Sequence, residues 1–145
     1  NELWECMNII EPPMARLAAG RSDQVLLRQL DENLRSSELA LSRGELLVTL
    51  DIEFHNCIAA LCGNRALMIG HEPLTRLFYP SFTAVTHKIP EAGKRMVEAH
   101  RYIVEAIHKH DGPGAEEWMR KHIFDFKRGY EMTHRDLAAP VSDSQ

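Results

Sequence analysis

Apolar residues recur along most of this chain at the three- and four-residue spacing of helices that bury one face. The first such run predicts a helix ending near Gly20, with an inward face formed by Leu3, Met7, Ile10, Met14 and Leu17. Pro12 and Pro13 lie inside this run, and each lacks a backbone N–H, so we expect a kink or a restart of the helix there.

Capping residues and glycines predict the bounds of the next two helices. Ser22 is the expected N-cap of a second helix that runs to Ser42. Its predicted inward residues are Leu27, Leu30, Leu34 and Leu41. A third helix is expected from Glu45 to Leu61, followed by a stop at Gly63.

A fourth helical segment is expected from Asn64, its predicted cap, to Lys88. Pro73 and Pro80 interrupt the pattern, so it predicts either one kinked helix or two short ones.

The last two predicted helices, Glu91 to His110 and Ala115 to Arg135, flank the turn sequence Asp-Gly-Pro-Gly at 111–114. A short turn of this kind predicts an antiparallel hairpin. No useful alternating strand pattern is present, so the fold class is all-α, an antiparallel bundle of six to seven helices. We expect one domain over residues 1–136 and a polar tail over 137–145.

Composition narrows the classes of function. The 145 residues are 44% hydrophobic and carry a net charge of −4, with basic residues scattered, which disfavours nucleic-acid binding by this piece. Cys6, Cys57 and Cys62 form no CxxC pair and indicate buried thiols in a reducing cytoplasm. The sequence indicates neither a membrane span nor a secretory signal, and because the chain starts at Asn1 we expect it to be cut from a longer protein.

Histidines interrupt the apolar faces of the last two helices. His100 falls in the stripe of Met96, Ile103 and Ile107, and His122 falls in the stripe of Ala115, Met119 and Phe126. The two histidines are equally distant from the turn, so an antiparallel hairpin places them at the same height. Asp51 and His55 are four residues apart on the third helix and project from one face.

Four polar side chains turned into a core need partners. An unpartnered buried imidazole costs about 1–3 kcal/mol, which mutual hydrogen bonds, water or a metal ion would offset. Three imidazoles and one carboxylate suit Zn²⁺, Ni²⁺, Mn²⁺ or Fe²⁺ better than Ca²⁺ or Mg²⁺. We therefore predict a metal site of Asp51, His55, His100 and His122, with zinc as the first choice.

The remaining histidines lack this convergence and are interpreted as surface or capping residues: His71, His87, His108, His110 and His134. The pair His71-Glu72 is not a zinc-protease motif, because Thr75 stands where the second histidine belongs.

The same positions resemble the FCD domain of GntR-family transcription regulators, over nearly everything from Leu3 to Ile123. The resemblance rests on Ile10-Glu11-Pro12-xx-Ala15-Arg16-Leu17-Ala18-Ala19, Asp51-xxx-His55, Gly63-Asn64, His100, Ala106-Ile107, Asp111, Ala115 and Met119-xx-His122. It implies a dimerising helical bundle that binds a small carboxylate or hydroxy-acid effector, often through a metal. It also implies a winged-helix DNA-binding domain upstream, through which the intact protein binds operator DNA.

By position, the family's metal ligands fall on the four residues chosen above, and Arg16 falls where the family can offer a guanidinium to the effector. We expect a regulatory domain and not an enzyme, located in the cytoplasm. Two alternatives stay open: a helical metalloenzyme using the same site, and a dimerisation bundle in which the ion is only structural.

Overall fold

The computed structural model describes residues 2–138, with side chains throughout except at 78–81, 83, 84, 87, 90 and 134–138. This part of the chain folds into six helices and contains no strand. The helices are α1 (Glu2–Ala19), α2 (Gln24–Ser42), α3 (Val48–Leu61), α4 (Arg65–Lys88), α5 (Pro90–His108) and α6 (Gly112–Ala138). The predicted all-α bundle is confirmed, with six helices.

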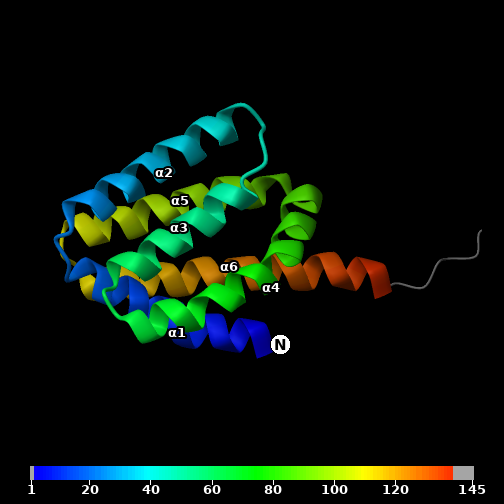
Figure 1. Ribbon diagram of the computed structural model, residues 1–145. Helices are drawn as coiled ribbons and strands as arrows, with labels where there is room; N and C mark the ends of the chain where they lie inside the picture. The colour runs from blue at the N-terminus through cyan, green and yellow to red at the C-terminus, as the bar shows by residue number, and fades with distance from the viewer. Residues whose placement is uncertain (1, 139–145) are drawn as a thin grey trace, which may run out of the picture.

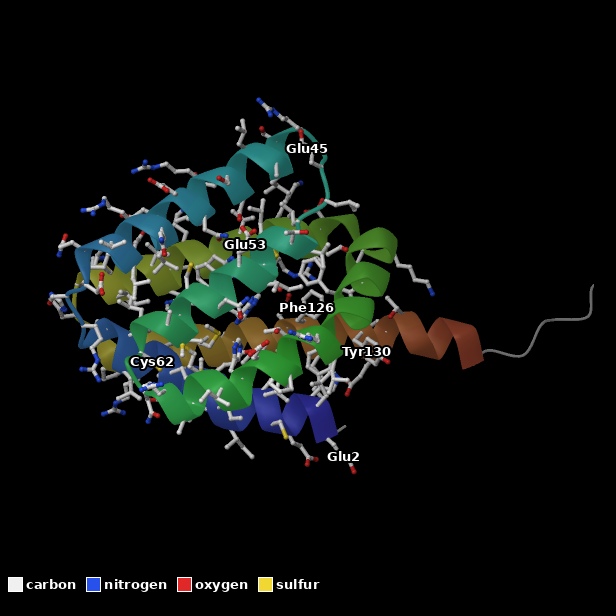
Figure 2. All side chains as sticks on the ribbon, in the orientation of Figure 1. Glu2, Glu45, Glu53, Cys62, Phe126 and Tyr130 are labelled. Atoms are coloured by element: carbon white, nitrogen blue, oxygen red, sulfur yellow. The ribbon has the colours of Figure 1, made fainter. Side chains whose placement is uncertain are left out.

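Two long helices, α5 and α6, form the predicted antiparallel hairpin, and α1 packs along α6 (Figure 1). Helix α3 contacts α1, α2 and α4, while α2 covers α3 and α5 from outside (Figure 1). Near the start of α1, the Trp4 ring lies against Phe126 and Tyr130, with its centroid 6.2 Å from that of Phe126 and 5.7 Å from that of Tyr130. Figure 2 shows Phe126 and Tyr130 on α6. The interior between α1, α3, α5 and α6 therefore receives side chains from several helices.

Helix α1 runs through Pro12 and Pro13 without a restart. Its packing along α6 favours the helix over the cost of the missing hydrogen bonds. The buried face is also turned relative to the prediction, since Leu17 is 39% exposed. The residues buried on α1 include Trp4, Met7, Glu11, Met14, Ala15 and Ala18.

Several predicted bounds are corrected by local hydrogen bonds. Asp23, not Ser22, caps α2, because its carboxylate accepts the N–H groups of Val25 and Leu26. Helix α3 begins at Val48, since the Glu45 N–H still bonds to the carbonyl of Ala40 after the turn at the end of α2.

Asn64 caps α4 as predicted, accepting from Ala66 and Leu67. The fourth segment is one helix that changes direction along its length, the kinked form of the prediction (Figure 1).

Helix α6 begins at Gly112, earlier than the predicted Ala115. The Asp111 carboxylate accepts the Gly114 N–H at 2.9 Å, which draws the Gly-Pro-Gly segment into the first helical turn. At the other end α6 reaches Ala138, two residues into the range expected to be a polar tail, and residues 139–145 lie outside the described part.

Candidate metal centre

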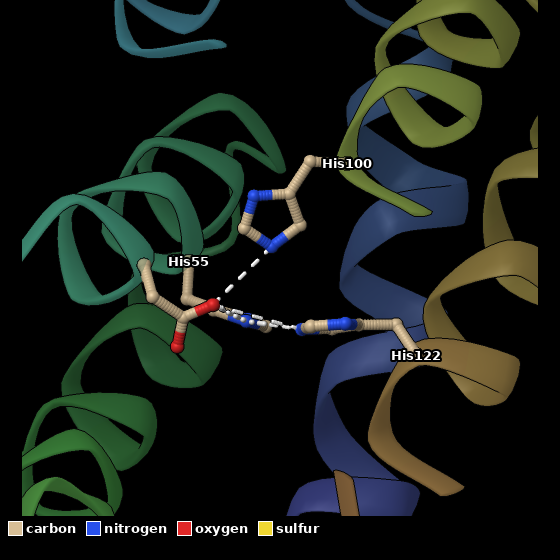
Figure 3. Close-up of side chains that lie close together, drawn as sticks. His55, His100 and His122 are labelled. Atoms are coloured by element: carbon tan, nitrogen blue, oxygen red, sulfur yellow. Dashed lines mark hydrogen bonds and ion pairs between the residues drawn. The ribbon is translucent and has the colours of Figure 1, made fainter. Parts of the chain in front are cut away.

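Three helices bring the four predicted ligands to one buried place. Asp51 and His55 come from α3, His100 from α5 and His122 from α6, with exposures of 1%, 4%, 0% and 7%. Figure 3 shows the three imidazole rings turned toward one another, with their ring nitrogens closest at the centre of the group. The residues chosen from helical periodicity therefore share one site.

The converging atoms are the Nε2 atoms of the histidines and Oδ1 of Asp51. His55 Nε2 and His122 Nε2 are 3.1 Å apart, and His100 Nε2 is 3.3 Å from Asp51 Oδ1. His55 Nε2 and His122 Nε2 each lie 3.8 Å from the same oxygen. One ligand atom from each residue can be chosen so that all four lie within 4.8 Å of one another.

These separations fit a single metal ion. A tetrahedral ion about 2.0–2.1 Å from nitrogen and oxygen ligands holds those ligands about 3.3 Å from one another. Within the described part of the chain, Asp51 Oδ1 and His100 Nε2 have no hydrogen-bond partner, although both are buried. A divalent cation would satisfy both atoms, whereas without one their nearest contact is with each other, at 3.3 Å and without hydrogen-bond geometry.

The ring of His100 is held by stacking. Its centroid lies 3.6 Å from that of Phe54, with an angle of 6° between the ring planes. Phe54 is fully buried on α3, between Asp51 and His55 in sequence. The helix that supplies two predicted ligands therefore also orients the third.

Two further buried polar residues behind His55, Glu11 and His71, were not predicted from the sequence. Glu11 of α1 places Oε2 2.5 Å from His55 Nδ1 and Oε1 3.0 Å from His71 Nε2 on α4. Glu11 and His71 are each 1% exposed, so the interpretation of His71 as a surface or capping residue is wrong. The missed signal is the four-residue step from Leu67 to His71 and Thr75, which places His71 on the inward side of α4.

Charges within the group decide which of these side chains are ionised. Burial alone would raise the pKa of Glu11, but the charges and hydrogen bonds of His55 and His71 hold it well below its usual range. Burial lowers the pKa of His55, but the carboxylates of Glu11 and Asp51 outweigh burial and raise this pKa to about 9. Without metal, Glu11 and His55 therefore form a buried ion pair.

The other two imidazoles are held neutral. Burial, followed by the charge of His55, lowers the pKa of His100 well below its usual value. Burial, with His100 and His55, lowers the pKa of His122 to about 3. Burial raises the pKa of Asp51 in spite of the neighbouring histidines. Neutral imidazoles are the form that coordinates metal.

His122 also borders a surface groove. The groove lies between α5 and α6, has a volume of about 260 Å³, and includes Ala99, Tyr102 and Trp118 in its lining. The Tyr102 and Trp118 rings stack at 4.1 Å, forming an aromatic wall. Arg95 and Asp125, 2.8 Å apart, contribute opposite charges to the same lining.

Arg16 does not join the buried group. Its side chain is 60% exposed, and its Nη1 lies 3.2 Å from Glu116 of α6. His108 and His110 agree with a surface or capping role, since His108 pairs with Asp31 at 2.7 Å and His110 Nδ1 lies 2.8 Å from the Ala19 carbonyl oxygen. The side chains of His87 and His134 lie outside the described residues.

No helix in residues 2–138 combines the length and apolar character required to cross a membrane.

Comparison with known proteins connects this bundle with transcription regulators. The curated relatives include the HTH-type transcriptional repressor NanR of Edwardsiella tarda (strain FL6-60) and that of Enterobacter sp. (strain 638). Each is 25% identical over 114 residues, which is 78% of this chain and 44% of the relative. The chain thus spans less than half the length of these relatives.

A solved structure, Streptococcus agalactiae GntR, superposes with a TM-score of 0.74 and 27% identity, over 88% of this chain and 57% of that one. A family model described as "FCD domain" matches residues 2–125. That match covers most of the chain and includes Asp51, His55, His100 and His122. The chain belongs to the FCD domain family, and its relatives are GntR-family regulators.

Proposed function

We propose that this FCD domain senses a small carboxylate or hydroxy-acid effector at a divalent transition metal held by Asp51, His55, His100 and His122. The observation that carries the proposal is the convergence of three imidazole nitrogens and one carboxylate oxygen, spaced as the ligands of one ion, in a buried place. The donor set favours Zn²⁺, with Ni²⁺, Mn²⁺ or Fe²⁺ as alternatives.

Charge explains why the effector would be an acid. A divalent ion with one carboxylate ligand keeps a net positive charge of one among the four ligands. An ion that expands beyond four protein ligands can accept a carboxylate or hydroxyl oxygen from outside. The effector would thus complete the coordination sphere and offset the remaining charge.

The groove beside His122 offers a route to this position. It is lined by aromatic rings and by two basic and two acidic side chains, and Arg95 can contact an anion there only if it leaves Asp125. Arg16, with its exposed guanidinium, remains our proposed further contact for the effector carboxylate, and that contact requires Arg16 to leave Glu116.

Ligation across helices gives a physical route to regulation. The predicted ligands come from α3, α5 and α6, so effector binding at the ion changes the balance of forces between these helices. An effector shifts a protein between two arrangements only if it binds one of them more tightly. We propose that the two arrangements are those of a homodimer, which controls a DNA-binding domain upstream of this chain in a cytoplasmic regulator.

The same residues provide little for an enzyme. Glu11, the nearest further carboxylate described, is already engaged by His55 and His71 and is not free to act as a general base. We therefore propose a regulatory domain and not a metalloenzyme. The matched relatives are transcription regulators.

The experiment that tests this function compares thermal unfolding of zinc-loaded and metal-free protein in lactate, malate or succinate. We expect at least one of these acids to raise the unfolding temperature of the loaded wild type and to leave the metal-free protein unchanged. His122→Ala, treated in the same way, should show no response. Equal responses with and without metal would contradict sensing at the ion.

A further inference from the structure

The polar pair behind the predicted metal site suggests a role for two residues outside the ligand set. Glu11 and His71 lie on α1 and α4, helices that supply none of the four predicted ligands. Both side chains are buried, and each oxygen of Glu11 lies beside a different imidazole. The carboxylate thus connects His55 to His71 across the bundle.

We infer that Glu11 is a positioning residue for the metal site, which fixes the orientation and tautomer of His55, and that His71 holds Glu11 in place. The inference rests on the proposed metal binding at Asp51, His55, His100 and His122.

The geometry assigns each nitrogen of His55 a separate task. Nε2 points to the converging ligand atoms, 3.1 Å from His122 Nε2, while Nδ1 lies 2.5 Å from Glu11 Oε2. A proton on Nδ1, donated to the carboxylate, leaves the Nε2 lone pair free for the ion. Metal-binding histidines are commonly oriented in this way, by a carboxylate that accepts the second N–H.

His71 explains why the Glu11 carboxylate stays in this position. Its Nε2 lies 3.0 Å from Glu11 Oε1, so a ring N–H can be donated to the oxygen that does not face His55. Without His71, that oxygen would be buried without a partner and the carboxylate would be free to turn. His71 therefore acts on the ion through Glu11 and His55.

A second metal ion held by Glu11, His55 and His71 is the competing interpretation, because these three residues also form a compact group of possible ligands. The short contact argues against it. Ligands of one ion lie about 3 Å or more apart when each is about 2.1 Å from the metal. Glu11 Oε2 and His55 Nδ1 are closer than that and have the spacing of a charge-assisted hydrogen bond.

The test measures Zn²⁺ affinity by competition with a chelator, together with metal stoichiometry and the stability of the metal-free protein. Glu11→Leu removes both acceptor oxygens at similar size, and we expect it to weaken Zn²⁺ binding by roughly 10–100-fold. Glu11→Gln, which can still accept from His55, should fall between Glu11→Leu and the wild type. His71→Phe leaves Glu11 and all four ligands intact and should give a smaller loss than Glu11→Leu.

Met14→Ala is the matched control, because Met14 is a fully buried apolar residue on the same helix. It should destabilise the metal-free fold and leave Zn²⁺ affinity unchanged, which separates positioning from stability. If Glu11→Leu does not fold, Glu11→Gln and His71→Phe carry the same comparison.

The outcomes separate the inference from the proposed function. Wild-type affinity in folded Glu11 and His71 variants would overturn the inference while metal binding stands. Two zinc ions per wild-type chain, with one lost in His71→Phe, would establish the second-ion interpretation instead. A wild type that binds no zinc would overturn the proposed metal site itself.

Discussion

The two buried polar groups of this domain share His55 but differ in how closely their polar atoms approach one another. Behind His55, Glu11 and His71 form a closed set of short contacts, with each carboxylate oxygen beside a ring nitrogen. In front of His55, Asp51 Oδ1 and His100 Nε2 are equally buried but more widely spaced: this oxygen lies 3.3 Å from His100 Nε2 and 3.8 Å from the Nε2 atoms of His55 and His122. The contrast indicates that the spacing of the polar atoms, more than the presence of histidines, distinguishes a metal site from a polar core network, because contacts of hydrogen-bond length leave no room for an ion between them.

The largest expected effect comes from the only carboxylate among the four predicted ligands. Asp51→Asn keeps the size of the side chain but removes the negative charge that faces the ion. We expect Zn²⁺ affinity to fall by more than about 100-fold, beyond the range of outer-shell substitutions. Chelator competition measures the change, and an affinity equal to that of the wild type would show that the ion lies elsewhere.

Metal binding should stabilise the front group, which is formed by Asp51, His55, His100 and His122, and thereby the whole fold. Free Zn²⁺ at about 100 times its dissociation constant stabilises the native state by about 2.7 kcal/mol. For a domain of this size, that corresponds to a rise of about 5–10 °C in unfolding temperature. Calorimetry with and without Zn²⁺ measures the shift, and His100→Ala should abolish it. A wild type that unfolds at the same temperature with and without Zn²⁺ would contradict binding of the ion to the native state.

In the metal-free protein, His122 and His55 should make the free energy of unfolding depend on pH in opposite directions. The pKa of His122 is lowered to about 3 in the fold, so its contribution to stability is present above the unfolded value near 6.5 and is lost as pH falls from 6.5 toward 3. The pKa of His55 is raised to about 9, so its contribution is present below 6.5 and is lost as pH rises through 9.

Urea unfolding across this pH range measures both effects. His122→Gln should reduce the loss of stability on the acid side and leave the alkaline side as in the wild type. Identical acid profiles for wild type and variant would contradict the neutral, buried state of His122. In the wild type, Zn²⁺ binding should also weaken as pH falls below about 9, because the proton that His55 then holds competes with the ion.

The smallest effect is expected from an exposed histidine. His108 is 44% exposed and pairs with Asp31 at 2.7 Å at the surface. His108→Gln should change the free energy of unfolding by less than about 1 kcal/mol and leave Zn²⁺ affinity unchanged. A change in affinity would mean that histidine content alone, rather than burial and geometry, governs metal binding.

Sequence periodicity was sufficient for the front group and insufficient for the group behind it. His100 and His122 interrupt long apolar stripes, so they are visible from the spacing of their neighbours. Glu11 was missed because the predicted face of α1, formed by Leu3, Met7, Ile10, Met14 and Leu17, shares Met7 and Met14 with the buried face but continues through Ile10 and Leu17 instead of Glu11 and Ala18. The stripe that is buried passes through Trp4, Met7, Glu11, Met14 and Ala18, where small alanines allow close packing.

The contact between Glu11 and His71 could not be predicted from the sequence, because it joins two distant segments. Nothing near Glu11 or His71 in sequence indicates that they meet, since sixty positions separate them and the contact depends on how α1 and α4 pack. Helix ends were misplaced for a local reason, because competing caps such as Ser22 and Asp23 differ only in which side chain reaches the free N–H groups.

The most direct test of metal binding at these four residues is elemental analysis of untagged wild-type protein beside His122→Ala, both purified without chelator. We expect one transition-metal ion per wild-type chain and a much lower content in His122→Ala. The contradicting result is a folded wild type that carries no metal and binds none on titration with Zn²⁺. Asp51, His55, His100 and His122 would then form a polar core network of the same kind as Glu11 and His71.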